Sequence, residues 1–212
     1  MYSNKKITEF NMLIVGTGGQ GQITLLQVLA EAALIENLDF KSSELHGLSQ
    51  RGGSVEVHIR FGKQIYSPMV SAGKDVLILG LEMQEALKAY PFASRATTKG
   101  EEENLFSSPF PQTTFLVNKE IIPIPLVKNL TEQELLKDLK KISRNIILVP
   151  AADICQKELE NRVVAGIYLI SLAAFKKLIP LKPDSILKAI KKIIPKKYLE
   201  LNLKAFNLAL NQ

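Results

Sequence analysis

An apolar run that passes into a helix through a glycine-rich loop is the feature that most constrains the fold of this chain. Met12–Val15 are apolar, Gly16–Gly21 have the spacing G-x-G-x-x-G, and an amphipathic stretch follows from Gln20 to Glu36. A buried strand that ends in such a loop and opens a helix is the building unit of α/β proteins, and the helix amino end attracts anions. We therefore expect an α/β protein with a candidate ligand site on this loop.

A second polar loop lies one strand–helix unit further along the chain, at residues 43–54. A short strand precedes this loop and an alternating strand follows it, so we expect both loops at the same edge of one sheet. The polar side chains of the second loop are crowded between glycines that leave room for a ligand or an interface. They are Glu44, His46, Ser49, Gln50 and Arg51, beside Gly47, Gly52 and Gly53.

The glycine loop alone leaves two interpretations open. Its glycines permit positive φ and close backbone approach, so the loop either binds a phosphate or is a tight turn that packs helix against strand. The three glycines of the motif, with Glu44 after the second strand, also fit a dinucleotide site. Thr17 and Gln20 are candidate side-chain donors in that site.

The charged residues near the second loop have structural alternatives as well. Arg51 suits a carboxylate or phosphate through its planar guanidinium, and the alternative is an ion pair with Glu44 or another acid. His46 either donates to a carbonyl or relays a proton, or it is held by Glu44 within a turn. For His58 we expect an ordinary position on the polar face of a strand.

Composition limits the cofactors that this chain can hold. Cys155 is the single cysteine among 212 residues, which excludes an intrachain disulfide and a cluster bound by four thiolates of this chain. The two histidines have no acidic cluster around them in the sequence, so we expect no bound metal. We expect Cys155 to be a small buried residue and not a nucleophile.

Hydropathy and charge indicate where the protein acts and what it binds. The sequence has no run of about eighteen apolar residues and its start does not resemble a signal peptide, so we expect a cytoplasmic protein that binds no membrane. The net charge of +6 is concentrated in Lys176–Lys204, which contains nine lysines against Asp184 and Glu200. With few aromatics there, this region predicts a solvated or partner-facing helix surface and no nucleic-acid binding.

Several local patterns predict individual elements. Gln64–Ser67 is expected to be a strand, and Thr113–Val117 with Ile121–Ile124 are expected to form a hairpin. Thr131 is expected to cap a helix that runs through Lys141.

Segments with strand and helix periodicity alternate to about residue 150, and the remainder is helical. We therefore expect a single domain over residues 1–212. Its architecture should be a three-layer α/β/α fold with a mostly parallel mixed sheet over about residues 8–150 and a helical C-terminal region over about residues 151–212.

Several strings of this sequence resemble a known enzyme family. The chain is similar to the gamma-type subunit of 2-oxoacid:ferredoxin oxidoreductases, and in particular to the small subunit of the indolepyruvate type. The similarity covers nearly the whole chain, and the H-G-x-x-Q-R-G-G string is its most specific part. The matching strings are Val15–Gly21, Ser43–Val55, Tyr66–Pro68, Asp75–Leu77, Leu81–Glu82, Val117–Asn118, Asn161–Val163 and Glu200–Phe206.

The resemblance implies a thiamine-diphosphate enzyme that oxidatively decarboxylates a 2-oxoacid such as indolepyruvate or another arylpyruvate. Such an enzyme passes electrons through iron–sulfur clusters to ferredoxin and delivers the acyl group to coenzyme A. This sequence has no Gly-Asp-Gly thiamine motif and one cysteine. The resemblance therefore implies that this chain binds no cofactor alone, and that thiamine diphosphate, magnesium and the clusters belong to a large alpha-type partner subunit.

The resemblance also implies roles for the two loops. The cofactor-facing edge of the shared site is formed by Gly16, Gly18, Gly19, Gln20, Gly21, Gly52 and Gly53. The side chains that face the partner's thiamine or the incoming coenzyme A are His46, Arg51, Glu44 and Gln50. Two other functions remain open: a freestanding reductase that binds NAD or FAD on the glycine loop, and a catalytically silent scaffolding subunit.

Overall fold

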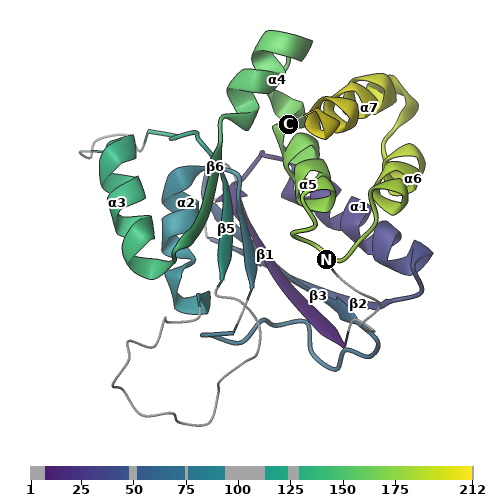
Figure 1. Cartoon of the computed structure of the whole chain (residues 1–212), viewed down its shortest axis with the longest axis horizontal. Coiled ribbons are helices and arrows are strands. Elements are labelled where there is room, and N and C mark those ends of the chain that lie inside the picture. Colours follow the sequence, from purple (N-terminus) through teal and green to yellow (C-terminus); the bar gives the residue numbers. More distant parts are fainter. Residues whose placement is uncertain (1–7, 48–51, 75, 94–112, 124–128, 212) are drawn as a thin grey trace.

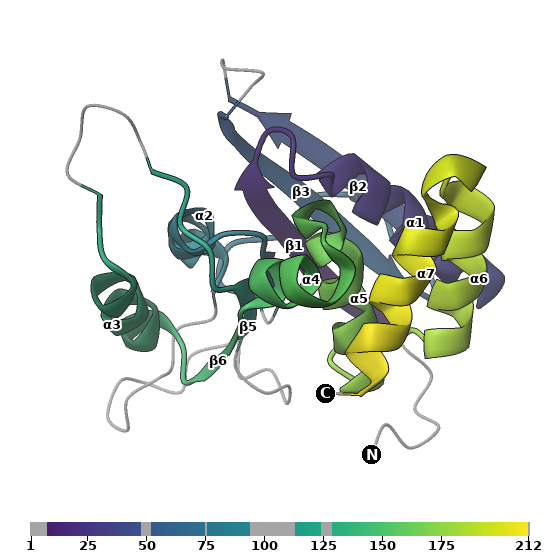
Figure 2. The same ribbon diagram turned by 90° about the horizontal axis from the view of Figure 1, so that it is seen from above.

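One mixed sheet with helices on both faces organises the chain (Figures 1 and 2). The computed structural model describes residues 8–47, 52–74, 76–93, 113–123 and 129–211. Its sheet has six strands in the order β2-β3-β1-β4-β5-β6. The expected α/β/α architecture with a helical C-terminal region is confirmed.

All the strands of this sheet except β3 point the same way. β2 belongs to this parallel set because both β1 and β2 are antiparallel to β3. The carboxyl ends of the parallel strands therefore lie at the same edge of the sheet. The strands are β1 (Glu9–Thr17), β2 (Asp39–His46), β3 (Ser54–Gly62), β4 (Leu77–Gly80), β5 (Thr114–Asn118) and β6 (Asn145–Val149).

The helices divide between the two faces of the sheet, and Figure 2 shows the two groups on either side. The larger group comprises α1 (Gln22–Ile35), α5 (Ala165–Phe175), α6 (Pro183–Ile193) and α7 (Lys196–Leu210). The opposite face carries α2 (Met83–Lys88) and α3 (Glu132–Ile142). Beyond the carboxyl end of β6 lies α4 (Ala151–Leu159), and the 3-10 turns are η1 (Tyr90–Phe92) and η2 (Arg162–Val164).

The apolar pattern of β1 explains why two cores form. Met12 and Ile14 belong to the core under α1 and α5, whereas Leu13 and Val15 belong to the core under α2 and α3. Successive side chains of a strand point to opposite faces, so a continuous apolar run suits a central strand covered on both sides. Within the described residues, no helix combines the length and apolar character needed to cross a membrane.

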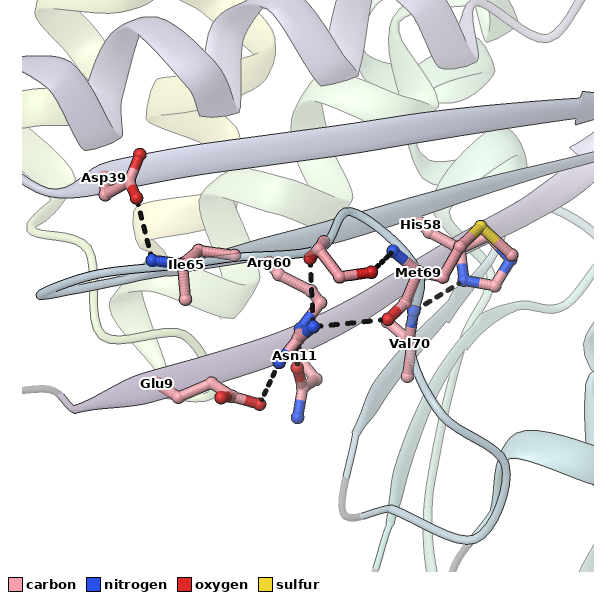
Figure 3. Close-up of polar contacts among 9 residues, drawn as sticks. Glu9, Asn11, Asp39, His58, Arg60, Ile65, Met69 and Val70 are labelled. Atoms are coloured by element: carbon pink, nitrogen blue, oxygen red, sulfur yellow. Dashed lines mark hydrogen bonds and ion pairs between the residues drawn. The ribbon is translucent and has the colours of Figure 1, made fainter.

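The predicted strand at Gln64–Ser67 is wrong. The Ile65 N–H donates to Asp39 Oδ2 at 2.7 Å, and Arg60 Nη1 donates to the Ser67 carbonyl at 2.9 Å (Figure 3). Arg60 also donates through Nε to Asn11 Oδ1 at 3.0 Å. Polar side chains satisfy this backbone, so the segment lies against the sheet without joining the ladder.

The predicted hairpin after residue 113 is also wrong. Phe115, Leu116 and Val117 are fully buried, and β5 pairs in parallel with β4 and β6. A short run buried on both faces is typical of a parallel strand, which the sequence pattern alone does not distinguish from one arm of a hairpin. Residues 121–123 form no strand, and Ile124 lies outside the described residues.

Candidate functional site

The two loops meet at the carboxyl edge of the sheet. At this point successive helices change from one face of the sheet to the other. β1 and β4 are neighbours, but α1 and α2, which follow them, cover opposite faces. In open α/β sheets this topological switch point leaves a crevice beyond the strand ends where ligands bind. The glycine loop and Leu81 border it, and the Leu81 N–H donates to the Val15 carbonyl at 2.8 Å.

The glycine loop is braced by its own side chains. Gln20 Oε1 accepts from the Thr17 N–H at 2.8 Å, and Gln22 Nε2 donates to the Thr17 carbonyl at 2.8 Å. A Cβ at Gly16 would lie 2.5 Å from Gln20 Oε1 and 2.9 Å from Gln22 Nε2. Gly16 is therefore needed for this packing, and the Gln20 amide expected to face a ligand acts here as an internal brace.

The outer half of the same loop is open. Gly19 and Gly21 have φ of 103° and 80°, a region that disfavours other residues, and nothing lies within 4 Å of a Cβ built on either. Gly21 starts α1 without a side-chain cap. The first N–H groups of α1 have no acceptor within the helix, and together with the helix dipole they favour an anion at this place.

The second loop lies directly beside the first. The Gly18 N–H donates to the Gly53 carbonyl at 2.8 Å, and Thr17 is paired with Ser54 in the β1–β3 ladder. The Gly47 N–H closes the second loop by donating to the Ser54 carbonyl at 3.1 Å. The structure thus brings the two predicted loops together. Gln50 and Arg51 lie outside the described residues, and Gly52 has φ of 69°.

Glu44 and His46 lie on β2, which extends further than the sequence pattern predicts. His46 Nε2 is 3.2 Å from Glu44 Oε2, and their side chains are 51% and 32% exposed. Residues two apart on a strand share a face, so Glu44 can orient the imidazole while both remain accessible. This geometry agrees with the interpretation in which Glu44 holds His46, although on a strand and not in a turn.

The strand order disfavours a dinucleotide site. In the Rossmann arrangement the acidic residue that binds ribose ends the strand adjacent to the glycine-loop strand. Here β3 lies between β1 and β2, which moves Glu44 two strands away from the glycine loop, about 9.5 Å at the usual strand spacing. The G-x-G-x-x-G match is therefore not accompanied by the rest of the dinucleotide site.

A cavity of about 240 Å³ opens between the second loop and α2. Its wall includes Ser54, Glu56 and Lys88. Lys88 Nζ donates to Glu85 Oε1 at 2.5 Å and to Ser54 Oγ at 3.1 Å. The wall also includes His46 and Gly47 of the predicted second loop. Sequence reasoning missed Glu56 and Lys88, because they come from separate elements whose proximity depends on the strand order.

His58 is fully buried, which corrects the expectation of an ordinary polar-face position. The Val70 N–H donates to His58 Nδ1 at 3.1 Å (Figure 3), so the ring proton is on Nε2, which donates to Glu56 Oε1 at 2.7 Å. The ring also packs edge-on against Phe92, with centroids 5.1 Å apart. His58 thereby fixes Glu56 in the cavity wall.

Asn118 joins the loops that follow three parallel strands. Its Nδ2 donates to the Leu81 carbonyl and to Glu120 Oε2, both at 3.1 Å, and its Oδ1 accepts from the Ala152 N–H at 3.1 Å. Glu120 Oε1 in turn accepts from Arg162 Nη2 at 2.8 Å. Residues that are far apart in the sequence thus converge at one edge of the sheet. Their order along the chain does not predict this convergence.

Three buried ionisable groups have raised pKa values, and one of them is the Tyr168 hydroxyl, whose pKa is raised by desolvation. Desolvation raises the pKa of the Glu82 carboxyl, although its oxygens accept from the N–H groups of Gln84 and Glu85 at the start of α2. Burial raises the pKa of the Cys155 thiol to about 11, which suits an inert side chain. Within the described residues, no group of three or more histidine, cysteine or acidic side chains is arranged to hold a metal ion.

Comparisons with known proteins give a consistent picture. The profile of the family described as "Pyruvate ferredoxin/flavodoxin oxidoreductase" matches residues 11–212. The indolepyruvate oxidoreductase subunit IorB of Archaeoglobus fulgidus is 28% identical over 206 residues, which covers 95% of this chain and 94% of that protein.

Two solved structures share the fold. The gamma subunit of a keto/oxoacid ferredoxin oxidoreductase from Geobacter sulfurreducens has a TM-score of 0.62 at 19% identity, over 95% of this chain and 96% of its own. The 2-oxoglutarate:ferredoxin oxidoreductase of Magnetococcus marinus, solved with 2-oxoglutarate, coenzyme A and succinyl-CoA bound, has a TM-score of 0.64 at 15% identity. That match covers 99% of this chain and 32% of the larger one.

Proposed function

Because this chain belongs to the pyruvate ferredoxin/flavodoxin oxidoreductase family, we propose that it is the cluster-free small subunit of a 2-oxoacid:ferredoxin oxidoreductase. In this proposal the chain completes an active site whose reactive cofactors lie on a large alpha-type partner. The observation that carries the proposal is the pair of loops joined by the Gly18–Gly53 hydrogen bond at an open carboxyl edge. This edge offers glycine backbone and polar side chains, which suit part of a site shared with a partner.

The residues of this chain do not fit an iron–sulfur cluster or the magnesium of thiamine diphosphate. One cysteine cannot hold an iron–sulfur cluster that needs four thiolates. Among the acids at this edge, Glu82 accepts backbone hydrogen bonds, Glu120 is paired with Arg162, Glu56 contacts His58 and Glu85 is paired with Lys88. Within the part of the chain that the structure describes, these acids form no group arranged to hold a metal ion, so we assign thiamine diphosphate, magnesium and the clusters to the partner.

We assign the positioning of coenzyme A to this chain. Coenzyme A carries phosphates, and the open amino end of α1 beside Gly19 and Gly21 is suited to one of them. In the second loop, Arg51 has the planar guanidinium that pairs with phosphate oxygens. His46, held by Glu44 and exposed at the same edge, is then placed to contact the thioester end or the partner's cofactor.

The proposed reaction is oxidative decarboxylation of a 2-oxoacid to an acyl-CoA, with ferredoxin as the electron acceptor through the partner. Indolepyruvate or another arylpyruvate is the proposed substrate, since the Archaeoglobus fulgidus relative carries that name. Residues 1–212 act as a single domain in this account, and the working compartment is the cytoplasm.

Reconstitution from separately purified subunits tests the proposal. We expect no turnover from this chain alone, little from the large subunit alone, and 2-oxoacid-dependent reduction of ferredoxin when the two are mixed. Full activity of the large subunit alone would instead identify this chain as a silent scaffold. Binding of NAD or FAD to the isolated chain, measured by calorimetry, would support the freestanding reductase and overturn the proposal.

A further inference from the structure

The lysines between Lys176 and Lys204 are all exposed, and most of them lack an acidic partner. Lys192 pairs with Glu31 at 2.7 Å, and Lys204 pairs with Glu200 at 2.8 Å. Within the part of the chain that the structure describes, the other seven of these nine lysines form no ion pair. The surface charge is therefore not neutralised by the fold itself.

Four of the unpaired lysines lie on the second half of α6 and the first turn of α7. This lysine corner consists of Lys188, Lys191, Lys196 and Lys197. α6 buries Ile186, Ala189 and Ile190 in the core it shares with α1, which leaves its lysines on the outer side. Figure 2 shows α6 and α7 together at the outer side of this helix layer.

Helix stability accounts for only part of this arrangement, because Lys191 lies in the last turn of α6, where the helix dipole favours a cation, whereas α7 shows the opposite. The first turn of α7 carries Lys196 and Lys197, has no acidic residue, and starts at Pro195 without a side-chain cap. A cation at the positive amino end of a helix is unfavourable. The ammonium groups and the helix dipole of α7 thus add to one outward positive potential, which a partner of opposite charge would neutralise.

We propose that the lysine corner docks a carboxylate-rich surface of an acidic protein. All four cations are lysines, whose hydrated ammonium groups on flexible stems suit electrostatic steering more than the two-pronged phosphate contacts of arginine. The exposed aromatic ring nearby is Tyr198, with Lys197 Nζ 5.2 Å from its centroid, which leaves little surface on which bases could stack. A membrane-binding helix would expose its apolar face, but α6 buries its own.

Binding of the full chain to a fluorescent poly-L-glutamate peptide, followed by anisotropy over a range of salt concentrations, tests the corner. The corner variant carries Lys188→Gln, Lys191→Gln, Lys196→Gln and Lys197→Gln. The control variant removes the same charge from exposed lysines of other faces, through Lys63→Gln, Lys137→Gln, Lys140→Gln and Lys157→Gln. Because all eight side chains are exposed, both variants should keep the wild-type thermal midpoint.

We expect the corner variant to lose at least about tenfold in affinity at low salt and to have a shallower salt dependence, while the control loses less than about threefold. Equal losses in both variants would show that net charge alone binds the peptide and would overturn the proposal. A corner variant that loses affinity for a short DNA duplex or for phosphatidylglycerol vesicles, but not for poly-L-glutamate, would also overturn it. These outcomes are independent of the proposed enzymatic function.

Discussion

At the scale of single residues, Gly16 shows that a glycine of the motif can be required for packing of the loop and not for ligand contact. A Cβ there would crowd the amides of Gln20 and Gln22, which brace the glycine loop. We expect Gly16→Ala to lower the free energy of unfolding by about 1–3 kcal/mol, as overpacking commonly does. In Gly47→Ala the new Cβ meets the Ser54 carbonyl at an ordinary 3.6 Å. Urea unfolding should separate the two variants, and equal stability would contradict this reading of the loop.

Cys155 gives a residue-scale prediction that depends on pH. Its thiol is fully buried, and its pKa is raised from 9.0 to about 11 because the thiolate would be desolvated. The folded state holds this proton more tightly than the unfolded chain, so its stabilising effect is complete below pH 9 and is lost as the pH rises to about 11. Relative to Cys155→Ala, the wild type should lose stability over this range.

The reactivity of the same thiol provides a separate check. We expect Cys155 to react slowly with Ellman's reagent at pH 8 in the folded protein and rapidly in urea, since burial withholds both the thiolate and the reagent. Rapid, complete labelling of the native chain would show that the thiol is accessible and would contradict the structure.

At the scale of elements, local sequence signals succeeded where the determinants are local. Thr131 caps α3 in a capping box with Glu134. The sequence pattern predicted this cap for a helix that runs through Lys141. The failed predictions, the strand at Gln64–Ser67 and the hairpin after residue 113, depend on partners distant in the sequence. Asp39 and Arg60 hold the first segment, and the neighbours β4 and β6 determine the second.

The amino end of α2 gives the element-scale prediction. The Glu82 carboxyl accepts from two N–H groups of α2, and burial raises its pKa above 4.5. The folded state therefore favours the protonated acid, and its stability falls as the pH rises through the raised pKa. Glu82→Gln keeps an acceptor without this penalty, so its unfolding free energy should vary less between pH 4 and 7. Glu82→Ala should lose about 1–2 kcal/mol, the cost of a missing cap, in chemical denaturation at pH 7.

A Glu82→Gln variant with the same pH dependence as the wild type would contradict this role for the buried carboxyl. If Glu82→Ala were as stable as the wild type, the capping hydrogen bonds would make no net contribution to the free energy of unfolding. Both comparisons use the same denaturation experiment, so an altered unfolded state would appear as a changed denaturant slope.

At the scale of the whole molecule, the sequence predicted the two loops and their shared edge, because both follow strands of the parallel set. It did not predict Asn118, Glu56 or Lys88, whose positions depend on strand order and on which face each helix covers. In the sequence, the glycine motif followed by Glu44 fits a dinucleotide site. The strand order β2-β3-β1 separates the two and removes this support. Topology, which local patterns do not encode, thus weighs against one of the functions that the sequence left open, the freestanding reductase that binds NAD or FAD.

The central claim is that the edge formed by the two loops positions coenzyme A for a partner subunit. The most direct test is the KM for coenzyme A of the reconstituted two-subunit enzyme carrying Arg51→Ala, with Arg144→Ala as the control. Arg144 is exposed and precedes β6, at the opposite edge of the sheet. We predict unchanged assembly by size-exclusion chromatography and a KM at least about tenfold higher for Arg51→Ala alone, the size expected for losing a charged phosphate contact. An Arg51→Ala enzyme that assembles and turns over with the wild-type KM would contradict the account.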